Sequence, residues 1–205
     1  MSFETSVFIN CPFDKAYIAL LRPILFCVID LGLEPRIASE RMDSGESRID
    51  KIVQLILACR FGIHDLSRLR AAKKNEFYRL NMPFELGVDF GCRRFKGGDY
   101  SRKRILILER ESFRYHAAIS DLSESDVAVH KDDPATACKV VRDWLAQDLA
   151  TPPPGPSSIW GRFEDFMADN FDELTARGFS ASDVESQPIN EVLASMRAWI
   201  DVHSP

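Results

Sequence analysis

Short runs of β-forming residues alternate with longer helical patterns over the first 150 residues of the chain. The runs predict five strands, at 6–10, 34–39, 61–65, 103–109 and 126–130. Between them, apolar residues spaced three and four apart predict helices at 15–31, 47–60, 81–95 and 133–149. Pro23 falls inside the first of these patterns, and we expect it to kink that helix or divide it in two.

Alternation of strands and helices predicts an α/β fold. We expect a flavodoxin-like or Rossmann-like parallel sheet of about five strands, with helices on both faces and right-handed crossovers. In such sheets a ligand binds beyond the carboxyl ends of the strands. This rule selects the segments 10–14, 39–45 and 64–67, and the turn before Glu85, as the candidate site.

A proline-rich segment at 151–158 divides the chain, because prolines at this density form a stiff, extended spacer. Beyond it, a C-terminal helical pair is predicted at 159–176 and 188–202. We therefore divide the chain into an α/β domain (1–150), a linker (151–158) and a helical appendage (159–205). Some fifty residues are few for an independent core, so we expect the pair to dock on the α/β domain or on a second subunit.

The composition of the chain limits the kinds of partner that we expect it to bind. Of 205 residues, 45% are hydrophobic and 28% are charged, which is typical of a globular protein. The formal net charge is -5, which excludes a protein that coats nucleic acid through its overall positive charge, so nucleic acid is not an expected partner. No apolar run approaches the ~18 residues of a membrane span, and no signal peptide is visible, so we expect a cytoplasmic protein without a membrane partner. The five cysteines and four histidines lack ligand spacing, which predicts reduced thiols and no metal site.

Charge is distributed unevenly along the chain. Residues 68–104 contain 11 Lys and Arg against 4 Asp and Glu, whereas residues 151–205 contain 3 against 9. The basic stretch flanks Glu85, where it could attract phosphates. It could equally hold the acidic C-terminal segment by complementary charge.

The strongest local motif opens the helix predicted at 81–95. Asn81 is a good N-cap and Pro83 suits a first helical turn. Glu85 should then lie in the opening turn, where the helix dipole favours its ionised form. Gly87 and Gly91 are four residues apart, so one face of the helix could approach the sheet closely.

Three segments of the sequence resemble a known family. VFINCPFD (7–14), IHDLS (63–67) and MPFELG (82–87) are similar, in order and spacing, to three motifs of the nucleoside 2-deoxyribosyltransferase-like proteins. Those proteins are relatives in architecture of bacterial TIR domains. The resemblance covers about the first 130 residues and does not extend to the C-terminal helices.

The resemblance implies that Glu85 is a nucleophile or charge stabiliser acting on the anomeric carbon of a ribosyl group, and that Asp65 orients the ribose. A carboxylate suits this chemistry because positive charge develops on the sugar as the N-glycosidic bond breaks. The candidate ligand-binding positions lie at the strand ends and in the adjacent loops: Asn10, Pro12, Phe13, Asp14, Ser44, Gly45, His64, Asn81 and Met82.

The resulting hypothesis is an N-glycosidase-type enzyme that cleaves or transfers the ribosyl–base bond of a nucleoside, nucleotide or NAD-like molecule. It needs no metal and no cofactor. The family resemblance and the aromatic C-terminal helices together suggest a homo-oligomer, most simply a homodimer. No GxGxxG or GxxxxGK[ST] sequence is present, so dinucleotide oxidoreductases and P-loop NTPases lack their phosphate loops here.

A second hypothesis is a TIR-like nucleotide-sensing or protein-interaction module of bacterial signalling or defence, without turnover. The transferases carry a further acidic residue shortly before the glutamate, whereas residues 78–81 read YRLN here. Structural alternatives also stand beside each site residue. Glu85 could simply stabilise its helix, Asp65 could cap the following turn, and His64 is more typical of a packed histidine.

Overall fold

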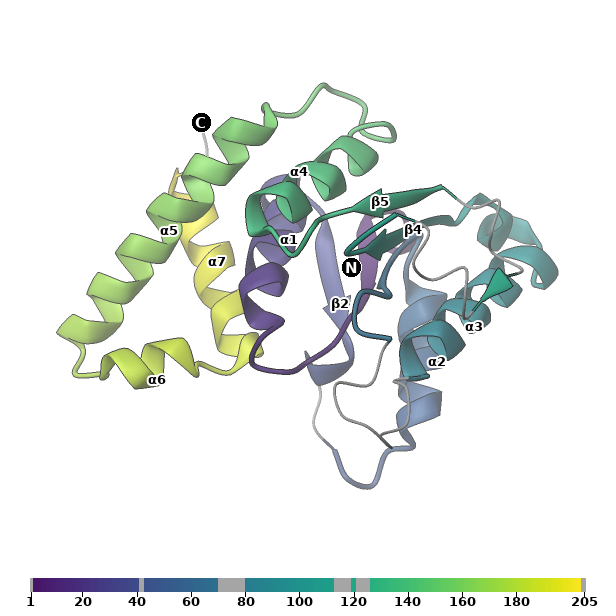
Figure 1. Cartoon of the computed structure of the whole chain (residues 1–205), viewed down its shortest axis with the longest axis horizontal. Coiled ribbons are helices and arrows are strands. Elements are labelled where there is room, and N and C mark those ends of the chain that lie inside the picture. Colours follow the sequence, from purple (N-terminus) through teal and green to yellow (C-terminus); the bar gives the residue numbers. More distant parts are fainter. Residues whose placement is uncertain (1, 41–42, 70–79, 113–118, 121–125, 204–205) are drawn as a thin grey trace.

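A parallel five-stranded sheet forms the centre of the molecule (Figure 1). The structure is a computed structural model and describes residues 2–40, 43–69, 80–112, 119–120 and 126–203. The strands lie in the order β2-β1-β3-β4-β5, which confirms the predicted α/β fold with a flavodoxin-like sheet. Their bounds are β1 Ser6–Asn10, β2 Glu34–Ile37, β3 Phe61–Asp65, β4 Arg104–Glu109 and β5 Val127–Val129.

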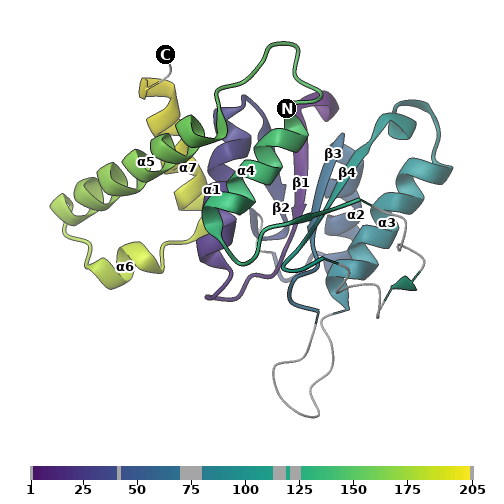
Figure 2. The ribbon, with the colours of Figure 1, turned by 45° about the horizontal axis from the view of Figure 1, so that its top comes forward.

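Helices cover both faces of the sheet, as Figures 1 and 2 show. Helices α1 and α4 pack on one face, and α2 and α3 pack on the other. The described helices are α1 Ile18–Asp30, α2 Arg48–Ala58, α3 Asn81–Phe95, α4 Pro134–Leu145, α5 Pro156–Ala176, α6 Ala181–Glu185 and α7 Ile189–His203.

Alternation along the strands divides the core between these two layers. Val7 and Ile9 of β1 belong to the cluster with α1 and α4, whereas Phe8 between them packs against α2. Ile107 of β4 belongs to a third cluster, on the α3 side. Successive side chains of a strand point to opposite faces, so a strand covered on both sides is buried along its whole length, as β1 and β3 are.

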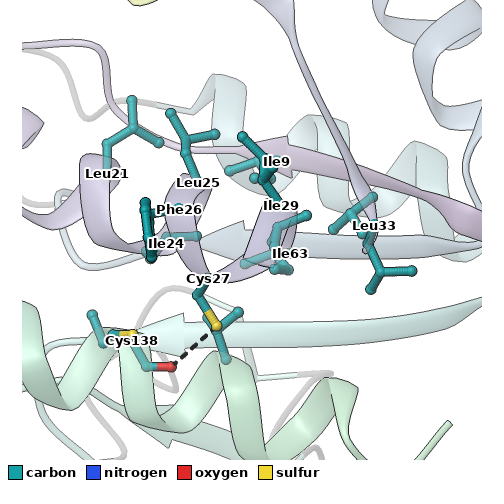
Figure 3. Packing of buried hydrophobic residues seen from close by; sticks show 14 of the residues in the cluster. Ile9, Leu21, Ile24, Leu25, Phe26, Cys27, Ile29, Leu33, Ile63 and Cys138 are labelled. Atoms are coloured by element: carbon teal, nitrogen blue, oxygen red, sulfur yellow. Dashed lines mark hydrogen bonds between the residues drawn. The ribbon is translucent and has the colours of Figure 1, made fainter. Parts of the chain in front are cut away.

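Helix α1 is buried around its whole circumference. Residues 23–29 are all buried. Residues of this helix pack against the sheet and against α4 (Figure 3), and Phe26 also packs against the C-terminal helices. The helix runs continuously through Pro23, so the predicted division at that residue is wrong. A proline removes one backbone hydrogen bond, here to the carbonyl of Ala19, and Ala19 is exposed, so water can replace the lost donor.

The C-terminal helices dock on the α/β domain, one of the two predicted arrangements. Phe26 of α1 stacks on Phe166 of α5 at 5.6 Å between ring centroids, and it also contacts Trp199 of α7 at 5.9 Å. Arg162 pairs with Asp30 at 2.8 Å at the rim of this contact. The aromatic stripes therefore belong to the core of a single chain, and this accounts for them without a second subunit.

The boundaries around this appendage differ from the prediction. Helix α5 begins at Pro156, inside the predicted linker, because proline suits the first turn of a helix. The residues before it are held against α4, since the Arg142 guanidinium donates to the carbonyl oxygens of Pro153 and Pro154. Helix α6 was not predicted. It has five residues, too few to show periodicity, and a Ser180–Asp183 capping box stabilises its start.

Candidate functional site

The sheet changes direction of winding between β1 and β3, and the candidate residues gather at the carboxyl ends of these two strands. The chain moves from β1 outward to β2 on one side, and from β3 outward to β4 and β5 on the other. Ligands of open parallel sheets bind at such a switch point. Asn10 and His64, the last and next-to-last residues of their strands, are register partners there.

The Asn10 side chain joins the end of β1 to the start of α3 by a hydrogen bond. Its buried Nδ2 donates to the Met82 carbonyl oxygen at 2.9 Å and lies 3.0 Å from His64 Nδ1. The amide thus donates to both groups, which makes His64 Nδ1 an acceptor and leaves the ring hydrogen on Nε2. Asn10 therefore acts through its side-chain amide and Met82 through its backbone carbonyl, and the hydrogen bond between them fixes the start of α3 against the end of β1.

A series of fully buried polar side chains, linked by hydrogen bonds and an ion pair, continues from His64. His64 Nε2 donates to Asp89 Oδ2 at 3.0 Å, and Asp89 Oδ1 lies 3.2 Å from Lys103 Nζ. Lys103 Nζ also donates to the Ile56 carbonyl oxygen at 2.8 Å and to that of Cys59. A buried charge is tolerated only when it is paired and hydrogen-bonded. The charged groups of this series, Asp89 and Lys103, are paired with each other. His64 is thus a packed histidine, the alternative that the sequence favoured.

Gly62 makes room for this series of polar side chains. A Cβ atom on Gly62 would lie 2.2 Å from Asp89 Oδ2 and 3.0 Å from His64 Nε2. Any larger residue would therefore displace the carboxylate. The strand residue and the helix residue fit together because the first has no side chain.

Asp65 lies on the opposite face of the sheet, in a separate buried cluster. The Tyr17 hydroxyl donates to its Oδ2 at 2.5 Å, and the Ser67 backbone N–H donates to its Oδ1 at 2.7 Å. His130 Nε2 lies 3.2 Å from Oδ2. With both oxygens occupied and 1% of its surface exposed, Asp65 organises the end of β3, as in the turn-capping alternative.

Glu85 differs from its neighbours because it is buried and has no hydrogen-bond or ion-pair partner among the described residues. It is 6% exposed, and no hydrogen bond or ion pair of its carboxylate occurs among the described residues. Burial raises the pKa of Glu85 from 4.5 to about 7, and the positive charge of Arg48 opposes part of that rise. Arg48 opens α2, so the ends of two helices meet at this carboxylate.

The predicted effect of the helix dipole on Glu85 is wrong. Helix α3 begins at Asn81, its cap is Leu80 and no side chain caps it, so Asn81 is the first helical residue and lies exposed. Glu85 is the fifth residue, beyond the first turn, where the dipole has weakened. Burial then dominates, and the neutral form is favoured instead of the ionised one.

The loop after β1 lies between the two carboxylates. Asp65 and Glu85 both raise the pKa of the buried Cys11 thiol, after the larger effect of burial. Pro12 is buried, whereas Phe13 is 41% exposed. Asp14 Oδ1 accepts from the Tyr17 backbone N–H at 3.0 Å and so caps the turn that leads into α1.

Other predicted positions lie at the surface. Ser44 and Gly45 are exposed, and the Gly45 N–H donates to Asp43 Oδ1 at 2.8 Å in a turn before α2. Gly87 is exposed, with no atom within 4 Å of an added Cβ, so the predicted close approach of the glycine face to the sheet is wrong. That face of α3 is turned outward because Leu86 and Asp89 point inward.

Two arginines of the basic stretch lie away from Glu85 along α3. Arg93 and Arg94 lie in the last turn of α3, some 12–14 Å along the helix from Glu85 at 1.5 Å per residue. The remainder of the stretch includes residues 70–79, which lie outside the described part of the chain. The predicted attraction of phosphates to Glu85 therefore finds no support in Arg93 and Arg94.

Sequence reasoning did not identify several residues of the site. Asp89 could have been noticed as an acidic residue one helical turn beyond Glu85, and Lys103 as a charge directly before an apolar strand. Tyr17 and His130 gave no local signal, because their role depends on chain segments far apart in the sequence.

Comparisons with known proteins add no relative. No family model matches the chain, and neither the curated proteins nor the solved structures include a match. Among the described helices, none is both long and apolar enough to cross a membrane. Nor do the described His, Cys, Asp and Glu side chains come together in groups of three that could hold a metal ion.

Proposed function

We propose that the surface at the carboxyl ends of β1 and β3 binds a nucleoside, nucleotide or NAD-like molecule, and that Glu85 promotes cleavage of its ribosyl–base bond. The observation that carries this proposal is the nearly buried Glu85 carboxylate, which lies at the switch point of a parallel sheet and has no partner among the described residues. Perturbed carboxylates in such positions are often functional. A purely structural glutamate would be expected to have a partner, as Asp65 and Asp89 do.

The chemistry follows from the charge that the reaction creates. Bond cleavage leaves the electron pair on the base nitrogen and positive charge on the sugar ring, which a carboxylate stabilises or captures as a glycosyl ester. Water or an acceptor base then takes the sugar. Asn10 and the series of buried polar side chains behind it act as positioning residues, because they fix the start of α3 and hence Glu85.

The charge of the ionised Glu85 carboxylate favours one substrate class within this proposal. A purine or pyrimidine leaving group must be protonated as it departs, whereas a pyridinium base such as that of NAD departs neutral without a proton. A cationic ring placed beside Glu85 would also lower the pKa of the carboxyl and hold it ionised. We therefore favour an NAD-like substrate over a neutral nucleoside.

The test is base release by the full chain. The protein is incubated separately with NAD, with nucleotides and with nucleosides, and free base is measured by chromatography. Glu85→Gln should abolish release, whereas Glu164→Gln, a matched change at an exposed position on α5, should leave it intact. Wild-type protein that releases no base from any of these substrates would refute the enzymatic proposal.

One observation favours the second candidate, a module that binds without turnover. Leu80 and Phe84, at the start of α3, are 64% and 60% exposed. Exposed apolar side chains beside a site suit contact with a partner protein. In that case calorimetry would detect nucleotide binding to wild-type protein, Glu85→Gln would change its affinity, and no free base would form.

A further inference from the structure

The C-terminal end of α3 forms an exposed basic and aromatic surface, which we call the α3 tip. A hollow there is lined by Phe90, Arg93, Arg94 and Ser101. Phe95 beside it is 86% exposed, the most exposed large hydrophobic side chain among those described. Neither Arg93 nor Arg94 has an ion-pair partner in the described parts of the chain. The α3 tip thus presents a ring and two positive charges without a partner.

A groove of the opposite character runs between α5 and α7, and we call it the α5–α7 groove. Small residues of α7, Ala194, Ser195 and Ala198, leave space beside the Phe166 and Trp199 rings. Acidic residues of α5 line the same groove. The remaining lining residues are Asp169, Asn170, Glu173, Val202 and His203.

The two surfaces are complementary in charge. Helix α5 contains one basic residue, Arg162, against five acidic ones: Glu164, Asp165, Asp169, Asp172 and Glu173. A groove floored by rings and lined by small residues can accept an aromatic side chain, and its acidic rim can meet arginines. Aromatic residues and arginine are enriched in protein interfaces.

These surfaces cannot meet within one molecule. Helix α3 lies on one face of the sheet, whereas α5 and α7 lie outside α1 on the other, and Figures 1 and 2 both place them at opposite ends of the molecule. The opposite charges of the α3 tip and the α5–α7 groove can therefore meet only between molecules.

We propose that the α5–α7 groove binds the α3 tip of a second copy of this chain, with Phe95 beside Trp199 and with Arg93 and Arg94 facing Asp169 and Glu173. The contact joins two different surfaces, so each molecule retains one unoccupied surface of each kind. Such head-to-tail contacts build an open chain unless the rotation closes a ring. The proposal is independent of the chemistry of Glu85.

Charge reversal tests the pairing directly. Sedimentation velocity and light scattering of the full-length protein should show a mass that rises with concentration beyond a dimer, and that falls as salt is added. Arg93→Glu/Arg94→Glu and Asp169→Lys/Glu173→Lys should each weaken self-association by about tenfold or more. A mixture of the two variants should associate again, because each tip then meets a groove of opposite charge.

Controls separate this contact from a general effect of charge or folding. Lys139→Glu, an exposed residue of α4, should leave association unchanged. Phe95→Ser should weaken association without altering the thermal unfolding temperature, since the ring packs against little of its own chain. A wild-type protein that stays monomeric at every concentration would overturn the proposal. So would a closed dimer that both charge reversals leave intact, or a mixture of the variants that fails to associate.

Discussion

Glu85→Gln is expected to stabilise the protein, and the gain should depend on pH. A carboxyl whose pKa is higher in the folded than in the unfolded state favours folding in its protonated form. The stability of the wild type should therefore be fully present below about pH 4.5, and part of it should be lost as pH rises through about 7. Glutamine does not ionise, so the variant avoids this loss.

The magnitude follows from the same two values. A rise in pKa from 4.5 to about 7 corresponds to about 3.4 kcal/mol, at 1.36 kcal/mol per pKa unit. Because water still reaches part of this site and moderates the cost of the charge, we expect about 2–3 kcal/mol at pH ~8 and less than about 1 kcal/mol at pH ~5. For a chain of this size, that gain raises the unfolding temperature by about 4–12 °C at the higher pH.

Urea unfolding of wild type and variant at a series of pH values measures this difference, in which the titration of all other groups cancels. Glu164→Gln serves as the control, since an exposed glutamate on α5 should give a difference near zero at every pH. A difference that does not change with pH, or a variant less stable than wild type at pH ~8, would refute the reasoning. Glu85 would then be ionised and paired in the folded protein.

Three further changes test the buried clusters. Gly62→Ala should cost about 1–3 kcal/mol in urea unfolding, since its Cβ would displace Asp89, and an unchanged midpoint would contradict that fit. Lys103→Met should cost about 3–5 kcal/mol because it leaves Asp89 charged and buried, and adding Asp89→Asn should recover part of the loss; no recovery would mean that the pair is not coupled. Tyr17→Phe should cost about 1.5–3 kcal/mol by removing its hydrogen bond to Asp65, and calorimetry would show a smaller loss if the bond were absent.

Local patterns were sufficient for the layers of the fold. The strands at 6–10 and 61–65 and the helix at 81–95 have the predicted bounds, because each is bordered by turn residues or a clear change of period. Helix α4 ends at Leu145, four residues before its predicted end, and β5 is shorter by one residue at each end. Helix ends are less well specified, since the last turn competes with nearby tertiary contacts.

The candidate site was predictable in its position but not in its contacts. The strand ends located Asn10, Asp65 and Glu85 at one edge of the sheet, as the topology requires. That Asp65 and Glu85 occupy opposite faces depends on which residues of β3 and α3 point inward, and the partners of Asp65 come from residues 17 and 130. The elevated pKa of Glu85 likewise results from tertiary burial, which no local pattern encodes.

The burial of α1 on every side has a consequence for synthesis on the ribosome. This helix is made before α5 and α7, yet the ring of Phe26 packs against Phe163, Phe166 and Trp199 of those later helices. Until those residues have left the exit tunnel, the nascent polypeptide carries an uncovered aromatic face that chaperones can recognise. Completion of folding is thus delayed until the last helix has been translated.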